Sequence, residues 1–239
     1  MPHHASVVIA TYNERENLGD LVSAVLTNDG FRVIVVDDNS PDGTGALADQ
    51  LAQTFSGRVS VIHRRTGRGL GRSLVAGLKR ALEDGAELVF QMDADFSHDP
   101  KYLPQMAAAA SDADLVLGSR YIDGVRVVNW PLHRIVLSSF ANKYVRAVTG
   151  LDIHDCTTGY RCWRRDALAR VPLDGIISEG YAFLVEQLYL ARKLGCRVRE
   201  VPIVFVERRE GSSKVSSTVL LESAIVPWRL RLRSDYIKV

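Results

Sequence analysis

Short apolar segments alternate with segments of helical periodicity through the first part of this 239-residue chain. The apolar segments are residues 6–10, 33–36, 59–62 and 88–92. Between them, apolar side chains recur at intervals of three and four residues, which is the spacing of one helix face. Strands that alternate with helices usually pair in parallel and are covered on both faces, so their sequences are almost continuously apolar. The alternation predicts an α/β fold with a Rossmann-like, doubly wound, mostly parallel sheet flanked by helices.

Two further strands are expected at residues 114–120 and 198–206. The composition is that of a globular chain, with 46% hydrophobic and 24% charged residues, and its net charge of +2 gives no indication of a nucleic-acid partner. The three cysteines form no close pair, which argues against a disulfide framework and favours a reducing cytosol. We find neither a signal-peptide pattern nor an apolar run of about 18 residues, so no membrane-spanning helix is predicted.

Two of the predicted strands end in paired carboxylates. Asp93 and Asp95 follow residues 88–92, and Asp37 and Asp38 follow residues 33–36. The carboxyl ends of parallel strands form the edge at which open α/β sheets bind ligands. Carboxylates two residues apart share one face of an extended segment, and their repulsion favours a hard cation such as Mg²⁺ or Mn²⁺ shared with substrate phosphates. A solvated acidic turn is the alternative for one such pair, but the second acidic strand end argues against it.

A basic, glycine-rich segment, residues 64–72, precedes a predicted helix at residues 73–82. The dinucleotide-binding pattern G-x-G-x-x-G is incomplete, because Arg72 stands where the last glycine is required. Glycines and arginines before a helix can still hold a phosphate anion. A surface loop without a ligand is the alternative.

Three motifs resemble the family 2 nucleotide-sugar glycosyltransferases, which have the GT-A fold: residues 8–14 (VIATYNE), 36–44 (VDDNSPDGT) and 92–95 (MDAD). More narrowly, the chain resembles the dolichol- and polyprenol-phosphate mannose synthases, through residues 95–100, 118–121, 134–138, 158–161, 179–183 and 208–214. The resemblance covers about residues 5–215 in order. It implies a GT-A-type catalytic domain at residues 1–214, followed by a tail at residues 215–239.

The resemblance also implies roles for particular residues. The donor nucleotide site would comprise Ala10, Tyr12, Glu14, Asp37, Asp38, Asp93, Ala94, Arg208 and Lys214. A tyrosine can stack on a base, and a carboxylate can accept hydrogen bonds from guanine. Without that role, Tyr12 would be a core aromatic and Asp37 a turn cap.

The implied metal ligands for Mg²⁺ or Mn²⁺ are Asp93, Asp95 and Ser97. Ser97 departs from the family, because many relatives have glutamine at this position, and a hydroxyl can ligate directly or through water. Arg120, Arg134 and Ser138 would bind the acceptor phosphate, since an arginine fork suits phosphate oxygens. The implied catalytic residues are Asp95, Arg120 and Arg134.

The implied reaction is inverting transfer of mannose from GDP-mannose to the phosphate of a polyprenyl (dolichyl-type) monophosphate. Transfer of another sugar, as from UDP-glucose, is an alternative within the family. A sugar nucleotidyltransferase can use the same sheet, basic loop and paired acids, although the match beyond Asp95 argues against it. A catalytically silent binding subunit is the third alternative, and the intact Asp93, Asp95, Arg120 and Arg134 argue against it.

The lipid acceptor implies peripheral attachment to the cytosolic face of a membrane. In the tail, Leu221, Ile225, Trp228 and Leu232 recur at helical spacing, and Pro227 is expected to bend or restart the helix. Arg229, Arg231 and Arg233 add positive charge that suits an anionic membrane surface. Alternatives are a helix packed on the sheet with its arginines in water, or a membrane-embedded partner protein.

For two further residues the sequence leaves both a structural and a functional role possible. Glu186 lies among apolar residues of a predicted helix and is either a buried partner for an arginine or a functional carboxylate. Cys156 lies in a polar turn without the histidine partner that an activated thiol needs, so packing is its expected role.

Overall fold

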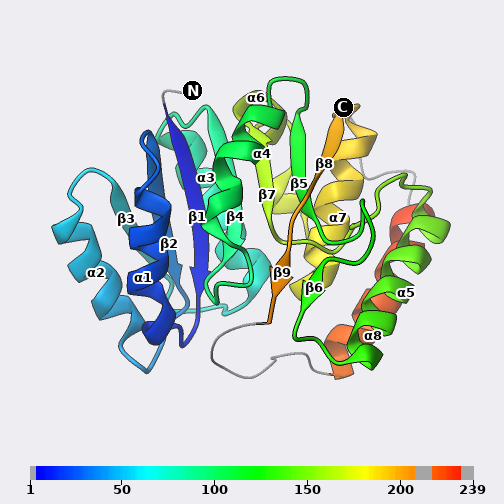
Figure 1. The fold of residues 1–239 in the computed structure, drawn as a ribbon, viewed down its shortest axis with the longest axis horizontal. Coiled ribbons are helices and arrows are strands. Elements are labelled where there is room, and N and C mark those ends of the chain that lie inside the picture. The colour runs from blue at the N-terminus through cyan, green and yellow to red at the C-terminus, as the bar shows by residue number, and fades with distance from the viewer. Residues whose placement is uncertain (1–3, 208–216, 233–239) are drawn as a thin grey trace.

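A computed structural model describes residues 4–207 and 217–232, which form a seven-stranded sheet with helices on both faces (Figure 1). The strands follow the order β3-β2-β1-β4-β7-β5-β8 across the sheet. Their bounds are β1 (Ala5–Thr11), β2 (Phe31–Asp37), β3 (Val59–His63), β4 (Leu88–Asp93), β5 (Leu115–Ser119), β7 (Arg161–Arg164) and β8 (Val198–Pro202). A separate parallel pair joins β6 (Val127–Val128) to β9 (Phe205–Val206).

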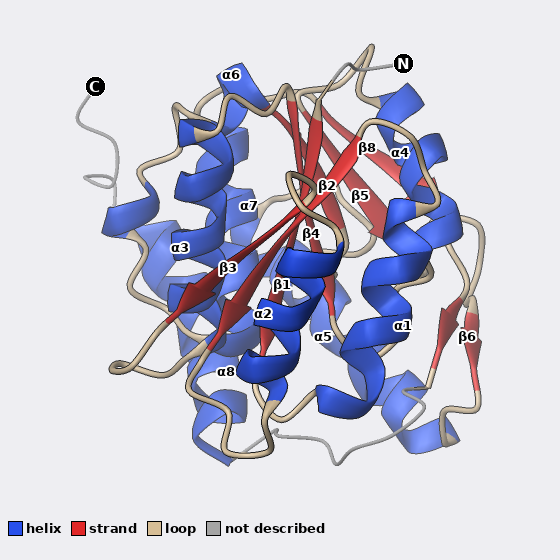
Figure 2. Cartoon of the chain, turned by 90° about the vertical axis from the view of Figure 1, so that its left-hand side faces the viewer, coloured by secondary structure: helices blue, strands red, loops and turns tan. Residues whose placement is uncertain are grey.

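The helices are α1 (Arg15–Leu26), α2 (Thr44–Thr54), α3 (Leu70–Glu83), α4 (Leu103–Ala109), α5 (Leu132–Thr149), α6 (Arg165–Leu168), α7 (Gly180–Lys193) and α8 (Ser217–Leu232), with 3-10 turns η1 (Pro100–Tyr102) and η2 (Leu173–Gly175). Helices α1, α2 and α4 cover one face of the sheet, and α3 and α7 cover the other (Figure 2). Successive side chains of a strand point to opposite faces, so Val7 and Ile9 pack in the core under α1 while Val8 packs under α3.

The predicted α/β fold with a mostly parallel sheet is confirmed, but an additional strand interrupts it. β7 lies between β4 and β5 and is antiparallel to both. Its residues, 161–164, lack an apolar run, although Arg161 and Trp163 are fully buried. Arg161 donates to Gln187 Oε1, and Trp163 Nε1 donates to Gln91 Oε1, each at 2.9 Å. These hydrogen bonds to residues distant in the sequence allow the two polar groups to be buried in the strand. Burial itself disfavours the charged guanidinium and lowers the pKa of Arg161 to about 9.

The strand predicted at residues 198–206 is two strands. β8 ends at Pro202, and β9 leaves the sheet to pair with β6. The backbone N–H of Val204, between them, donates to the Tyr102 hydroxyl at 3.0 Å, so this residue does not continue the ladder of hydrogen bonds. The strand predicted at residues 114–120 is β5, which ends at Ser119 and leaves Arg120 just beyond the sheet.

The direction of winding reverses between β1 and β4. From β1 the chain proceeds outward to β2 and β3, and α3 then returns it to the other side of β1. The registers place Thr11 beside Asp37 and Ala10 beside Asp93 at the carboxyl edge. Open α/β sheets bind ligands at such a switch point, so the register brings the predicted acidic strand ends to the expected position.

Helix α8 packs against α5 and α7 at the end of the sheet remote from β3 (Figure 1). It continues through Pro227, so of the two effects expected of this proline, a bend or a restart of the helix, the restart does not occur. Val226 and Leu230 are buried, whereas Ile225 and Trp228 are exposed. Within residues 4–207 and 217–232, no helix combines the length and apolar character needed to cross a membrane.

Candidate active site

A cavity of about 620 Å³ opens at the carboxyl ends of β1 and β4. Ten of the predicted site residues line it: Ala10, Tyr12, Glu14, Asp38, Asp93, Ala94, Asp95, Ser97, Arg120 and Arg134. Asp37 and Ser138 are not among the lining residues, and the predicted donor-binding residues Arg208 and Lys214 lie outside the described residues. The fold therefore brings most of the predicted site together from segments far apart in the sequence.

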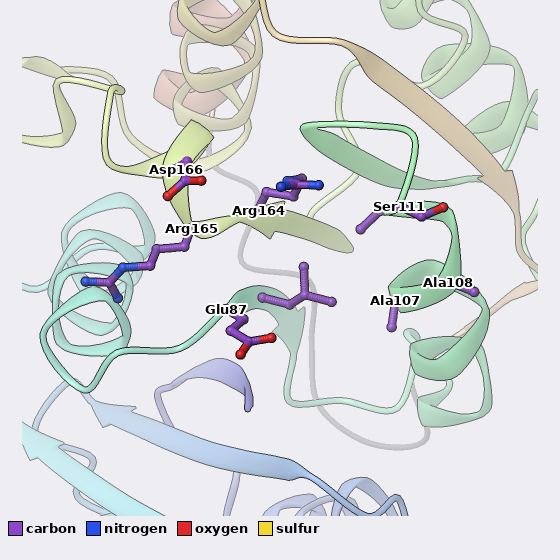
Figure 3. A pocket seen from close by; sticks show the side chains of 9 residues that line it. Glu87, Ala107, Ala108, Ser111, Arg164, Arg165 and Asp166 are labelled. Atoms are coloured by element: carbon purple, nitrogen blue, oxygen red, sulfur yellow. The ribbon is translucent and has the colours of Figure 1, made fainter. Parts of the chain in front are cut away.

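A second cavity of about 540 Å³ lies at the opposite edge of the sheet (Figure 3). Its lining includes Glu87, just before β4, and Ala107 and Ala108 of α4. The side chain of Arg165 points toward the end of α3, where its Nη1 donates to the Leu82 carbonyl at 2.6 Å. Because no predicted site residue lines this cavity, the cavity at the carboxyl edge is the candidate active site.

Asp93 and Asp95 differ in their surroundings. The Asp93 side chain, at the end of β4, is 45% exposed, whereas Asp95 is buried. Asp95 Oδ1 accepts hydrogen bonds from Ser97 Oγ at 2.6 Å and from the Ser97 backbone N–H at 3.1 Å. The buried His98 accepts a hydrogen bond at Nδ1 from the Asp93 backbone N–H at 3.0 Å, and its ring stacks on Tyr160. These contacts fix the backbone that carries both carboxylates.

The oxygen donors of this segment fit Mg²⁺ or Mn²⁺. Hard cations of this kind are usually bound by one or two carboxylates and completed by water and substrate phosphates. Asp93 and Asp95 supply such carboxylates, while the Ser97 hydroxyl donates to Asp95. In the described part of the chain, no group of three or more His, Cys, Asp or Glu side chains forms a closed metal site.

The two acids that follow β2 have separate functions in the fold. Asp37 accepts hydrogen bonds from the Ser40 hydroxyl at 2.5 Å, the Ser40 backbone N–H at 3.1 Å and the Thr11 hydroxyl at 3.2 Å, as a turn cap does. Asp38 lines the cavity and pairs with Arg64, and it accepts the Gly69 N–H at 2.9 Å. Asp38 therefore ties the glycine-rich loop to the end of β2.

The glycine-rich loop packs closely against the start of α7. The Gly71 N–H donates to Glu179 Oε2 at 3.1 Å, and Arg72 Nε lies 3.0 Å from Glu179 Oε1. A Cβ atom at Gly69 would lie 2.6 Å from the Glu179 carboxylate, so a larger residue would displace it. In the same loop, the Arg68 guanidinium lies 4.2 Å from the centre of the Tyr12 ring. The loop thus borders the cavity beside the predicted base-stacking tyrosine.

Arg120 is held rigidly beside the cavity. Its Nε and Nη2 each donate to the fully buried Asp155 carboxylate at 2.7 Å, and Nη2 also donates to the Thr157 hydroxyl at 2.9 Å. Burial alone would raise the pKa of Asp155, but the charge and hydrogen bonds of Arg120 outweigh burial and lower it. Within the described residues Nη1 makes no hydrogen bond, so Arg120 keeps one donor group for a ligand.

Arg134 lies in the first turn of α5 and stacks on Trp130, with 4.1 Å between the guanidinium carbon and the ring centre. The Arg120 guanidinium lies 5.7 Å from the same ring. Both arginines therefore adjoin one indole in one cavity. Ser138, one turn further along α5, accepts a hydrogen bond from the Tyr121 hydroxyl at 2.7 Å.

The surroundings of Glu186 and Cys156 indicate structural roles for both. Glu186 is fully buried, and its Oε2 accepts the Ser178 N–H at 3.1 Å and lies 3.8 Å from Arg229 Nη2. It is therefore the buried partner of an arginine. Arg229 is only partly exposed, whereas Arg231 of the same helix is exposed, as the packed-helix alternative expects. Cys156 is buried, and burial raises the pKa of its thiol to about 12, which agrees with packing.

Sequence reasoning missed several residues around this cavity: His98, Trp130, Asp155, Glu179 and Glu207. Trp130 and Glu179 line the cavity directly, while Asp155 and Glu207 pair with the two cavity arginines. The acidic residues lie 35 and 73 positions from their arginine partners, so no local spacing indicates the pairs.

The sheet order and the position of the cavity at the switch point agree with the GT-A fold of glycosyltransferases. The chain belongs to glycosyl transferase family 2, whose sequence pattern matches residues 6–171. It is 45% identical to a polyprenol monophosphomannose synthase of Mycolicibacterium smegmatis over 96% of this chain and 88% of that protein. It is 44% identical to an undecaprenyl-phosphate mannosyltransferase of Micrococcus luteus over 97% of this chain and 96% of that protein.

Solved structures confirm the fold. The chain resembles a glucosyl-3-phosphoglycerate synthase of Mycobacterium tuberculosis in complex with Mn²⁺, UDP and glucosyl-3-phosphoglycerate, with a TM-score of 0.68, 18% identity, and coverage of 96% of this chain and 80% of that one. The same enzyme with Mg²⁺ and UDP gives a TM-score of 0.63 at 18% identity, covering 88% and 73% of the two chains. At this identity the likeness defines the architecture alone.

Proposed function

We propose that this protein transfers mannose from GDP-mannose to the phosphate of a polyprenyl (dolichyl-type) monophosphate, with inversion at the sugar C1. The observation that carries the proposal is one cavity lined both by the carboxylates Asp93 and Asp95 and by the arginines Arg120 and Arg134. The donor diphosphate and the acceptor phosphate are both anions. A metal ion on the carboxylates would neutralise the first, and the arginines would neutralise the second. The two curated relatives, whose names specify mannosyl transfer to polyprenol or undecaprenyl phosphate, support the choice of sugar and acceptor.

The donor occupies the side of the cavity formed by β1, β2 and the glycine-rich loop. Tyr12 stacks on the base, and Asp38 or Glu14 accepts hydrogen bonds from the guanine edge. Ala10, Ala94 and Asp37 shape this side of the site, and Arg208 and Lys214 contact the diphosphate. Asp93 and Asp95 would hold Mg²⁺ or Mn²⁺, and such an ion would supply positive charge beside the nucleoside diphosphate leaving group. Ser97 orients Asp95 through its hydrogen bonds.

The acceptor phosphate supplies its own nucleophile. An oxygen of the anionic phosphate attacks C1, and the bond from C1 to the diphosphate oxygen breaks as the new bond forms. No general base is needed, because the phosphate is already deprotonated near neutral pH. Arg120, Arg134 and Ser138 bind the acceptor phosphate. The positive charge of the arginines offsets the repulsion between this phosphate and the donor diphosphate, so catalysis depends on positioning and charge neutralisation.

The acceptor lipid reaches the site from a membrane surface. Exposed apolar side chains of α5 and α8 form what we name the α5–α8 apolar face: Leu132, Val136, Leu137, Phe140, Ile225, Trp228 and Leu232. Tyr144 of α5 donates to the Ala224 carbonyl of α8 at 2.6 Å, which holds the two helices together. We propose that this face rests on the cytosolic side of the bilayer, with residues 1–214 as the catalytic domain and residues 215–239 as its membrane-contacting tail. A membrane-embedded partner protein is the alternative means of attachment.

A donor screen tests the reaction. The full chain is incubated with radiolabelled GDP-mannose or UDP-glucose, a polyprenyl phosphate, and Mg²⁺ or Mn²⁺, and labelled lipid is extracted. We expect mannolipid from GDP-mannose and none after chelation of the metal. Labelled lipid from UDP-glucose alone would reassign the donor. Pyrophosphate release from a nucleoside triphosphate and a sugar phosphate would indicate a nucleotidyltransferase, and no reaction under any condition would indicate a silent subunit.

A further inference from the structure

Each of the two cavity arginines is paired with a carboxylate, but the two pairs differ in kind. Asp155 is fully buried and binds Arg120 through two side-chain hydrogen bonds at 2.7 Å and through the Arg120 backbone N–H at 3.0 Å. Removing this carboxylate from its arginine would leave a charge without solvent, which is costly. The Asp155 pair is therefore permanent.

Glu207 binds Arg134 through one contact, from Nη1 to Oε1 at 2.5 Å. The two side chains are 28% and 30% exposed, so water can solvate either one when the pair opens. The Glu207 backbone is anchored separately, because its N–H donates to the Val128 carbonyl of β6 at 3.1 Å. The carboxylate can thus swing away from Arg134 while the chain that carries it stays in place.

The position of Glu207 conflicts with an occupied acceptor site. Arg134 lines the cavity and stacks on Trp130, next to the one free donor group of Arg120 in the described structure. An anion that uses both arginines must share Arg134 with Glu207 or replace it. A carboxylate beside a bound phosphate is a repulsive pair of like charges, so replacement is favoured.

We infer that Glu207 is a displaceable counter-ion of the acceptor subsite, which leaves Arg134 when the acceptor phosphate binds and returns to it when the product departs. This inference rests on the proposed function. The acceptor is a phosphomonoester with a charge of about −1.5 to −2, whereas the product is a phosphodiester with a single charge. The returning carboxylate competes with the product for Arg134 and so promotes its release. Glu207 weakens the binding of both lipids by the same factor, because both must displace it.

The test uses the full chain with GDP-mannose, metal and farnesyl phosphate, a short polyprenyl monophosphate that stays in solution. Glu207→Gln removes the competing charge and keeps the size of the side chain. The matched control is Asp123→Asn, which removes one charge from an exposed pair with Arg126 and does not line the cavity. Initial rates give KM for acceptor and donor, and added farnesyl phosphomannose gives the product inhibition constant.

Removing a partly exposed ion pair should change the affinity of a ligand that competes with it by about fivefold. We expect Glu207→Gln to lower both the acceptor KM and the product inhibition constant about fivefold, while the donor KM and the Asp123→Asn kinetics match the wild type. A raised acceptor KM would overturn the inference, because it would mean that Glu207 holds Arg134 in place for the phosphate. An unchanged acceptor KM would also overturn it. Absence of mannosyl transfer by the wild type would instead refute the proposed function, and the inference with it.

Discussion

At the scale of single residues, the site is a set of charges whose orientation other side chains fix. The Ser97 hydroxyl donates a hydrogen bond to Asp95, and the Asp93 backbone N–H donates one to the His98 ring. Arg120 is held by its hydrogen bonds to Asp155. A group that is already oriented needs no reorganisation when substrate binds, which is the main source of electrostatic catalysis. The residues that do the orienting are therefore expected to affect the reaction without contacting substrate.

Ser97 provides a direct test of this arrangement. Ser97→Ala removes the 2.6 Å bond to Asp95, and loss of such a supporting bond typically weakens metal affinity by about 10-fold or more. We expect a higher metal concentration for half-maximal transfer with an unchanged acceptor KM, and near-complete loss of transfer in Asp95→Asn. Ser111→Ala, at the second cavity, is the matched control. Full activity of the wild type after thorough chelation would contradict the proposed metal site.

The Asp155–Arg120 pair should appear in the pH dependence of stability. Asp155→Asn leaves a buried arginine without its counter-charge, at a cost of about 3 kcal/mol. The folded-state pKa of Asp155 lies below its unfolded value, so the contribution of the pair is complete above about pH 4 and is lost as the pH falls through the folded-state pKa.

Denaturant unfolding from pH 7 to pH 3 measures this effect. The difference in unfolding free energy between wild type and Asp155→Asn should be constant down to about pH 4 and shrink below it. Asp152→Asn, which breaks the exposed pair with Arg146, should change stability by less than about 1 kcal/mol. A difference that grows in acid would show that the pair does not lower the pKa of Asp155.

At the scale of elements, α8 is joined to the active-site side of α7. Glu222 of α8 accepts the Glu179 N–H at 3.2 Å, and Arg229 Nη2 donates to the Ser178 hydroxyl at 2.9 Å. Glu179 in turn holds Gly71 of the glycine-rich loop. The C-terminal helix is thus part of the structure that supports the cavity, beyond its proposed contact with lipid.

The Arg229–Glu186 contact is open to a double-mutant test. Arg229→Met keeps most of the packing but leaves the fully buried Glu186 without its cation, and breaking such a pair costs about 3 kcal/mol. Adding Glu186→Gln should recover at least about half of that loss, because the uncompensated charge is gone. Denaturant unfolding of both single variants and the double variant measures the coupling. Strictly additive losses would mean that the two side chains do not interact.

At the scale of the whole molecule, the cavity and the α5–α8 apolar face share α5, which carries Arg134 on its first turn and exposes Leu132, Val136 and Phe140. Exposed apolar surface gathered on neighbouring helices usually marks a contact with a partner or a membrane. A lipid whose phosphate lies at Arg134 would have its chain beside this surface. The position of the site therefore suits an acceptor that stays in its bilayer during transfer.

Vesicle flotation tests the apolar face. Replacing Ile225, Trp228 and Leu232 by serine removes three exposed apolar side chains, and at about 1 kcal/mol each the affinity for anionic vesicles should fall about 100-fold. Activity on soluble farnesyl phosphate should persist, because none of the three lines the cavity. If the variant and the wild type float equally, another part of the protein, or a partner, provides the attachment.

The α/β class and the acidic edge were predictable from the sequence because both follow from short-range order. Alternation of apolar segments with helical spacing determines the parallel sheet, and the position of Asp93 after its strand places it at the carboxyl edge. The family resemblance was likewise carried by short motifs, and it is confirmed. These features depend on neighbours within a few residues along the chain.

Tertiary structure alone decided how the site is held. In the antiparallel strand β7, the buried guanidinium of Arg161 donates a hydrogen bond to Gln187. In the cavity, Arg120 forms an ion pair with Asp155, and Arg134 forms one with Glu207. A charged side chain enters a core or a cavity only when a partner of suitable polarity meets it there, and these partners come from distant segments. The sequence by itself thus determined that paired carboxylates lie at the carboxyl edge of the sheet, whereas folding decided which distant side chains join them in the cavity and which partners hold its arginines.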